Sequence, residues 1–161
     1  MKIRLAVPTD LPQILAIYNE GIEDRVATLE QDPKPLDYMK EWWLEHQGRY
    51  AVLVAESEDG VIGWCSLNRY SHRCAYDGVA DLSVYIARDH RGRGVGSLLL
   101  QELETAARTR GIHKIVLFTF PHNGLGQGLY RKCGYREVGV FRNQGRLDGR
   151  FIDVMAMEKL L

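Results

Sequence analysis

Apolar residues recur along the chain at two spacings, and each spacing predicts one kind of element. Leu11, Ile14 and Ile22 stand at helical spacing behind Thr9 and Asp10, which are suited to cap a helix N-terminus. Shorter runs that alternate or are continuously apolar predict strands. The patterns predict helices from about residue 11, over 36–46 and 97–110, and from Asn123 to Cys133. They predict strands over about 3–6, 50–56, 61–67, 79–86, 114–120, 135–141 and 151–159.

This order of elements predicts one mixed α/β sheet with helices on its faces. The order is β-α-α-β-β-β-α-β-α-β-β, with hairpins in the middle and at the end and crossover helices elsewhere. Segment 114–120 is almost entirely apolar, which predicts a central strand covered on both faces. In segment 79–86 the alternation directs Leu82, Val84 and Ile86 to one face of the strand. Asp81, Ser83 and Tyr85 point to the other face.

Length and composition limit the class of protein. The 161 residues are enough for one well-buried core, and no linker or repeat divides them, so we expect a single domain over 1–161. Equal numbers of basic and acidic residues, 21 each, argue against a binder of nucleic acid or membranes that works through bulk charge. Three widely spaced cysteines and the lack of a signal-like or membrane-length apolar run favour a cytoplasmic location.

The strand over 79–86 leads into a glycine-rich basic loop, Arg91-Gly92-Arg93-Gly94-Val95-Gly96, and then into a helix beginning near Ser97. Glycines let backbone N–H groups turn toward a ligand, and the helix N-terminus adds positive potential, so the stretch suits a diphosphate. The spacing differs from the Rossmann fingerprint and from a Walker A loop. The alternative is an ordinary glycine-rich surface turn.

The same loop matches the R/Q-x-x-G-x-G/A signature and resembles the GCN5-related N-acetyltransferases, the GNAT superfamily. The order of elements is similar too, which implies a GNAT-like, largely antiparallel sheet of about seven strands flanked by four helices. Segments YNEGI at 18–22, AYD at 75–77, SVYI at 83–86, GVGS at 94–97 and HN at 122–123 resemble the phosphinothricin N-acetyltransferase group.

The resemblance implies acetyl-CoA as cosubstrate, with no metal. It implies that backbone groups of Val84, Tyr85 and Ile86 contact the pantetheine arm. The diphosphate would then be held by the loop, and Asn123 would contact the cosubstrate from the next crossover. The loop residues concerned are Arg91, Gly92, Arg93, Gly94, Val95, Gly96 and Ser97.

Transfer to an amine requires a base, an oxyanion donor and a proton for the departing thiolate. Asp81 is the base candidate, because it stands where the resembling group usually carries Glu; the shorter side chain implies a bridging water. Tyr130, seven residues after Asn123, is the acid candidate by resemblance. We expect the oxyanion donor to be a backbone N–H at a bulge in the strand. The alternatives are an exposed strand carboxylate for Asp81 and a core aromatic for Tyr130.

Arg25, Arg73 and Tyr76 are candidates for binding the acceptor, because an arginine can pair with a carboxylate or phosphinate. Surface ion pairs or packing are the alternatives, and for Trp64 packing is favoured. His72 and Cys74 form only half of a metal site, so no metal is expected.

These features predict an acetyl-CoA-dependent N-acetyltransferase for a small primary amine, such as an amino acid, phosphinothricin or methionine sulfone or sulfoximine. A protein or peptide N-acetyltransferase and a non-catalytic acyl-CoA-binding domain are the alternatives. Homodimers are frequent among the enzymes that this chain resembles.

Overall fold

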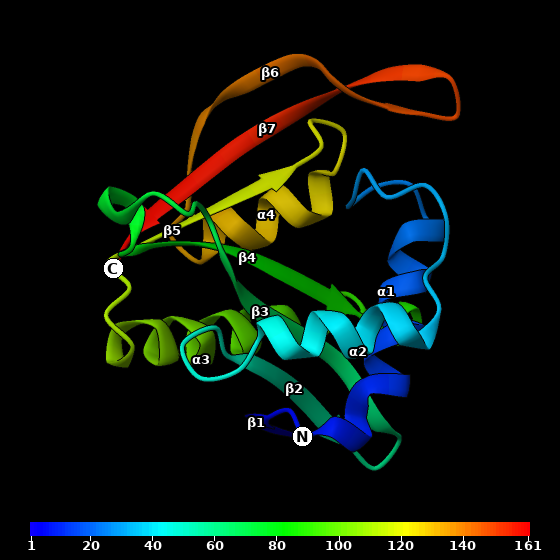
Figure 1. Cartoon of the computed structure of the whole chain (residues 1–161). Coiled ribbons are helices and arrows are strands. Elements are labelled where there is room, and N and C mark those ends of the chain that lie inside the picture. The colour runs from blue at the N-terminus through cyan, green and yellow to red at the C-terminus, as the bar shows by residue number, and fades with distance from the viewer.

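The computed structural model describes all 161 residues. Its order of helices and strands is the predicted one, with short 3₁₀ turns between some of them (Figure 1). The strands are β1 (Lys2–Leu5), β2 (Val52–Ser57), β3 (Gly60–Arg69), β4 (Val79–Ile86), β5 (Lys114–Thr119), β6 (Arg136–Leu147) and β7 (Arg150–Leu160). The helices are α1 (Leu11–Glu23), α2 (Leu36–Glu45), α3 (Val95–Thr109) and α4 (Gly124–Lys132).

All seven strands form one sheet in the order β1-β2-β3-β4-β5-β7-β6. Every neighbouring pair is antiparallel except β4 and β5, so the predicted mixed, largely antiparallel sheet is confirmed. The parallel pair is short: Val79 to Asp81 pair with Lys114 to Val116, and the ladder ends there. Beyond Asp81 the two central strands are no longer paired, and this break in the sheet positions the site.

The sheet has a core on each face. The predicted inner face of β4 is confirmed, since Leu82, Val84 and Ile86 join the larger cluster with α3 and α4. Tyr85 points the other way and packs against the smaller cluster, which α1, α2, β2 and β3 form. Trp64 belongs to this second cluster and is 2% exposed, so it is a packing residue, as favoured.

The prediction that 114–120 is covered on both faces is wrong. Ile115 and Leu117 are buried, but Val116 is only partly buried and Phe118 is 42% exposed. The reason is tertiary: α1 and α2 pack over β2, β3 and β4, and no helix lies over the same face of β5. That face of β5 is therefore available to a ligand.

Two element boundaries differ from the predictions. β6 continues to Leu147 instead of ending near 141, because pairing with β7 resumes after an irregularity between Phe141 and Gly145. The long β6–β7 hairpin projects from the body of the protein (Figure 1). α3 begins at Val95, with Gly94 as its N-cap at φ +82°. Two helices are each followed by a glycine in the left-handed region, α3 by Gly111 at φ +76° and α4 by Gly134 at φ +92°.

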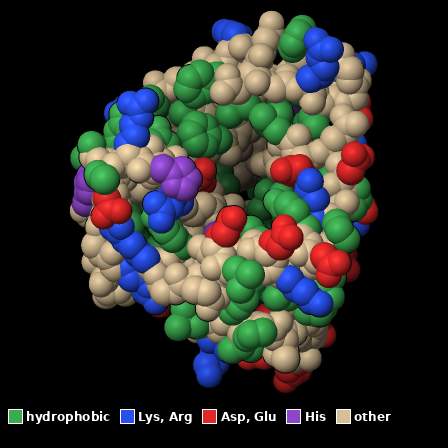
Figure 2. Space-filling model, in the orientation of Figure 1, with side chains coloured by type: hydrophobic (Ala, Val, Ile, Leu, Met, Phe, Trp, Pro, Cys, Tyr) green, Lys and Arg blue, Asp and Glu red, His purple; other side chains and the backbone are tan.

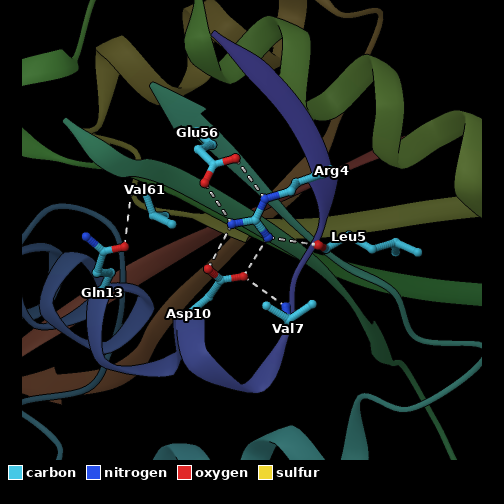
Figure 3. A network of polar contacts seen from close by, with 7 residues as sticks. All are labelled: Arg4, Leu5, Val7, Asp10, Gln13, Glu56 and Val61. Carbon is cyan, nitrogen blue, oxygen red and sulfur yellow. Dashed lines mark hydrogen bonds and ion pairs between the residues drawn. The ribbon is translucent and has the colours of Figure 1, made fainter. Parts of the chain in front are cut away.

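Asp10 stands at the start of α1, but its carboxylate does not cap the helix as predicted. Arg4 donates to both of its oxygens, at 2.8 and 2.9 Å, and the Val7 N–H donates at 2.8 Å (Figure 3). The same guanidinium also reaches Glu56 on β2, at 3.0 Å. Asp10 therefore joins the first helix to the edge of the sheet.

Candidate functional site

A cavity of about 440 Å³ lies in the gap where β4 and β5 separate. β4 forms one wall, the glycine loop and the first turn of α3 form one end, and α4 forms the other wall. Figure 2 shows the molecule hollowed between the β6–β7 hairpin and the α1–α2 region, with hydrophobic side chains around the opening. Of the predicted cosubstrate-binding residues, the lining includes Val84, Tyr85, Ile86, Arg91, Gly92, Gly94, Ser97 and Asn123.

Three residues of the predicted loop do not line this cavity. Val95 is buried in the larger core, and Arg93 is exposed. Gly96 is buried in the first turn of α3, where a Cβ would lie 2.8 Å from a methyl carbon of Leu129. Gly96 therefore allows α3 and α4 to approach each other closely.

The backbone of β4 offers hydrogen-bonding groups to the gap. The Ala87 N–H donates to Ile62 on β3 at 2.8 Å, so the alternation of an antiparallel pair turns the N–H and C=O groups of Leu82, Val84 and Ile86 toward the other edge. Pairing between β3 and β4 runs without a register shift, so the expected bulge in this strand is absent. Free N–H groups arise instead because β5 diverges.

The glycine loop has the conformation that an anion cradle needs. Gly92 and Gly94 have φ of +75° and +82°, and no atom lies within 4 Å of a Cβ built on either. Because Gly94 is the N-cap of a 15-residue helix, the first N–H groups of α3 point into this end of the cavity. The loop can therefore hold a diphosphate through backbone donors.

Two of the basic side chains near the loop are held by an acidic partner. Arg91 donates to Asp24 at 2.6 Å and to the Ile86 carbonyl at 3.1 Å, and Arg88 donates to Asp24 at 2.9 Å. Burial opposes ionisation of Asp24, but these two guanidinium groups hold its pKa below the ordinary value. Arg88 and Arg91 thus brace the loop against the end of α1.

A second cavity, of about 200 Å³, adjoins the first on the open face of β5. The two share Ala27, Val84, Tyr85, Asn123 and Tyr130 as lining residues. Asp81 lines only the second cavity, and it is the last residue of β4 that pairs with β5. Burial raises the pKa of Asp81 to about 6, although the neighbouring amide of Asn68 lowers it. A carboxylate with this pKa can accept a proton near neutral pH.

Tyr130 lies where the two cavities meet and is 9% exposed. Burial, and then the charge of Asp81, raise the pKa of its phenol well above the ordinary value, so the hydroxyl is protonated at neutral pH. The ring also packs in the larger core, edge-on to Tyr135. Tyr130 therefore combines a packing position with a phenol next to the site.

The structure does not bring the three predicted acceptor-binding residues to either cavity. Arg25 donates to Asp148 at 2.9 Å and to the Gln31 carbonyl at 2.6 Å, which links the segment after α1 to the β6–β7 turn. Arg73 precedes the 3₁₀ turn Cys74–Tyr76 and is exposed. Tyr76 is 43% exposed and lies edge-on to Tyr70.

Other residues form the walls of the second cavity. The sequence patterns did not single them out as site residues, because they come from three segments far apart in the chain. They are Ala27, Thr28 and Leu29 after α1, Phe118, Thr119 and Phe120 at the end of β5, and Val154 on β7. No sequence signal marked Phe118, because its exposure on a central strand, which suggests a ligand surface, is visible only in the structure.

Two further findings concern the whole chain. No group of three or more His, Cys, Asp or Glu side chains is placed to hold a metal ion. None of the helices has both the length and the apolar character needed to cross a membrane.

Comparison with known proteins identifies the class to which this fold and site belong. Residues 14–135 match the family described as the acetyltransferase (GNAT) family. The chain belongs to this family, and it is an N-acetyltransferase.

Its relatives match over nearly their full lengths. It is 36% identical to YwnH of Bacillus subtilis, over 100% of this chain and 99% of the relative, whose name assigns it provisionally to the phosphinothricin acetyltransferases. It is 35% identical, over 97% of this chain and 92% of the relative, to an L-methionine sulfoximine/L-methionine sulfone acetyltransferase of Pseudomonas aeruginosa. A phosphinothricin acetyltransferase from Sinorhizobium meliloti, solved with acetyl-CoA, superimposes with a TM-score of 0.93 at 30% identity, covering 99% of this chain and 88% of that one.

Proposed function

We propose that the 440 Å³ cavity binds acetyl-CoA and that the 200 Å³ cavity binds a small primary amine. The observation that carries the proposal is the shared wall of the two cavities, with Asp81 on the amine side and Tyr130 at the junction. An acetyl group bound at this junction would lie within reach of an amine in the second cavity.

Each step of the transfer is then carried out by a different group of the two cavities. Asp81, as carboxylate, accepts a proton from the acceptor's ammonium group, directly or through one water, which frees the nitrogen lone pair. That nitrogen attacks the thioester carbonyl, so a C–N bond forms while the backbone N–H groups facing the gap donate to the developing oxyanion. The C–S bond breaks, and Tyr130 donates its phenolic proton to the thiolate. The nitrogen passes its second surplus proton to the phenolate through water, and Asp81 releases its proton to solvent, so both residues return to their starting states. The products are the N-acetylated amine and the free thiol.

The acceptor that we propose is an amino acid or an amino-acid analogue, such as phosphinothricin, methionine sulfoximine or methionine sulfone. The names of the relatives support this class, and a 200 Å³ cavity suits a molecule of that size. Its walls combine aromatic and aliphatic side chains with Thr28, Ser83 and Thr119, which suits a short side chain with a polar end.

The test is a screen for thiol release with acetyl-CoA and a panel of amines. The panel holds phosphinothricin, methionine sulfone, methionine sulfoximine, the common amino acids and short peptides. We expect turnover with a free amino acid or analogue. We also expect Asp81→Asn to lose about 10²–10⁴-fold in kcat while still binding acetyl-CoA. Turnover with peptides alone would favour a protein or peptide N-acetyltransferase, and acetyl-CoA binding without turnover would favour a non-catalytic acyl-CoA-binding domain.

We further propose that Arg25 acts on the acceptor cavity indirectly, by holding the segment that carries Thr28. Arg25→Ala should then raise KM for the acceptor more than KM for acetyl-CoA. An equal change for both substrates would argue against this role.

The exposed apolar residues of the β6–β7 hairpin, among them Val138, Phe141 and Phe151, support the proposal of a homodimer. Light scattering after gel filtration would measure the mass directly, and a monomer at micromolar concentration would contradict the proposal.

The three cysteines are all free, which supports a cytoplasmic location. Fractionation of the source cells would test it.

A further inference from the structure

A network of buried and half-buried polar side chains lies beneath Asp81 and connects it to the end of α2. Asn68 of β3 is the direct neighbour of Asp81 across the ladder, and its amide lowers the pKa of that carboxyl against the effect of burial. The amide nitrogen of Asn68 also donates to the Ser83 hydroxyl, at 3.0 Å. On its other side, the amide oxygen accepts from the Ser66 hydroxyl at 2.9 Å and lies 2.7 Å from Nε2 of His46.

Both ring nitrogens of His46 face acceptors. Nδ1 lies 2.7 Å from the carbonyl oxygen of Trp42, which can only accept, and Nε2 lies 2.7 Å from the Asn68 oxygen. A neutral imidazole carries one N–H, so it can satisfy only one of these contacts. The side chain is 9% exposed and its ring stacks on Trp42 with centroids 4.2 Å apart, a surface that favours a cation.

Two arrangements resolve this conflict. In the first, His46 is an imidazolium and donates from both nitrogens, so the amide of Asn68 keeps its nitrogen toward Asp81 and Ser83. In the second, His46 is neutral and the amide is reversed, so that its nitrogen donates to Nε2 and its oxygen faces Asp81. An oxygen in that position repels a carboxylate but accepts a hydrogen bond from a carboxylic acid.

We propose that His46 is a positioning residue for Asp81, acting through the side-chain amide of Asn68. The imidazolium holds the amide nitrogen toward Asp81 and keeps this residue ionised. Loss of the imidazolium proton reverses the amide and lets Asp81 retain its proton. The charges of the two residues are therefore linked, although no proton passes through the amide. The inference concerns how the site is controlled and rests on the proposed role of Asp81.

Other charged and titratable groups surround the pair. Tyr85 of β4 and Tyr130 of α4 face Asp81. A separate cavity of about 640 Å³ beside His46 is lined by Glu45, Arg49, Tyr50, Arg69, Tyr70, His72 and Asp77. The carboxylate of Asp77 is paired with Arg49 at 2.7 Å, and none of the ion pairs of the protein involves His46. His46 is therefore connected to Asp81 through Asn68, with which it shares a hydrogen bond and which is paired with Asp81 across the ladder.

The direct test is the protonation of the His46 ring, read from its ¹⁵N chemical shifts at neutral pH. We expect two protonated nitrogens in the wild-type protein, and one in Asp81→Asn and in Asn68→Leu. Two protonated nitrogens in all three proteins, or one in all three, would overturn the linkage. This readout does not require the protein to turn over any substrate.

The kinetic test uses the acid limb of the pH dependence of kcat. His46→Leu and Asn68→Leu should move the limb upward by about one pH unit, because Asp81 then holds its proton more tightly. His46→Gln, whose amide can donate from nearly the position of Nε2, should restore the limb. Gln47→Ala, which changes only a surface contact to Trp43, should leave it in place.

Thermal unfolding separates these effects from misfolding, because a folded His46→Leu with an unmoved acid limb would contradict the proposal. The linkage between His46 and Asp81 can also be tested separately from the role of Asp81 as a base. If the ¹⁵N shifts show the linkage but Asp81→Asn retains full turnover, the proposed role of Asp81 fails and the linkage stands.

Discussion

Gly21 is the residue of α1 that lines the larger cavity of the site. Its replacement by alanine tests the packing that positions Tyr85. Gly21 is buried in a helical turn without positive φ, so an alanine causes no backbone strain and should favour the helix by about 1 kcal/mol. However, its Cβ would lie 2.7 Å from Cδ1 and 2.9 Å from Cε1 of the Tyr85 ring.

The size of the effect follows from these distances. Carbon atoms pack at about 3.5–4.0 Å, so the ring must move by about 1 Å. It has little room, because it packs against Tyr18 and Trp64 with centroids 5.1 and 5.2 Å away. Overpacking of this kind costs about 1–3 kcal/mol, which exceeds the helical gain and leaves a net loss of about 1 kcal/mol. We expect a fall of about 2–4 °C in Tm.

The effect on turnover should be larger, because Tyr85 lines both cavities. A displacement of about 1 Å at a reacting centre can lower the rate by about 10²-fold. Urea unfolding and kcat/KM, measured on the same preparations, compare the two effects.

The control repeats the substitution in a Tyr85→Leu background, where the smaller side chain removes the contact. There Gly21→Ala should stabilise the protein by about 1 kcal/mol, the helical gain alone. A higher Tm and unchanged turnover for Gly21→Ala in the otherwise wild-type protein would refute the reasoning.

Three further predictions concern charge and conformation. Because burial raises the pKa of Asp81 to about 6, kcat should fall below that pH. The fall should be about tenfold per pH unit and should be absent in Asp81→Asn, which initial rates across the acid range would show. Arg4→Ala should cost about 3 kcal/mol at neutral pH, because it leaves the buried Asp10 carboxylate with the Val7 N–H alone. Hydrogen bonds from Arg4 hold the pKa of Asp10 below its ordinary 3.8. The stabilisation is therefore present above pH 3.8 and is lost as the pH falls through the lower pKa of the folded protein. Urea unfolding at neutral and acid pH would show that the cost of Arg4→Ala shrinks in acid. Gly94→Ala should cost about 1 kcal/mol for its positive φ and should weaken acetyl-CoA binding, measured by unfolding and by titration.

Much of the fold was predictable because its signals are local. Periodic apolar residues determine which segments become helices or strands, and Gly111 and Gly134 end two helices through their own conformations. Asn123, the predicted start of the last helix, is its N-cap and accepts from the Gly126 N–H at 3.1 Å. The open face of β5 was not, because Phe118 is exposed only through the placement of helices far away in the sequence.

The site was predictable to a similar degree. The glycine loop, Asp81 and Tyr130 carry recognisable residue types in order, and the structure places the loop at one cavity, Asp81 at the other and Tyr130 at both. The wall around Thr28 and the pairing of Asn68 with His46 depend on which distant segments pack together. No local pattern in this one sequence records such neighbours.

The short ladder between β4 and β5 has a consequence for how the protein responds to its cosubstrate. Past Asp81, the edge of β4 presents the backbone groups of Val84 and Ile86 without a strand to pair with them. The pantetheine arm of acetyl-CoA carries two amides and is about as slender as a strand, so under the proposed function it would complete the sheet by augmentation. Cosubstrate binding is then also a folding contribution, worth about 2.7 kcal/mol at a hundredfold excess over Kd. Hydrogen exchange at the Val84 and Ile86 amides should then slow most on addition of acetyl-CoA, because the bound cosubstrate strengthens a connection between the two halves of the sheet that the short ladder alone provides in its absence.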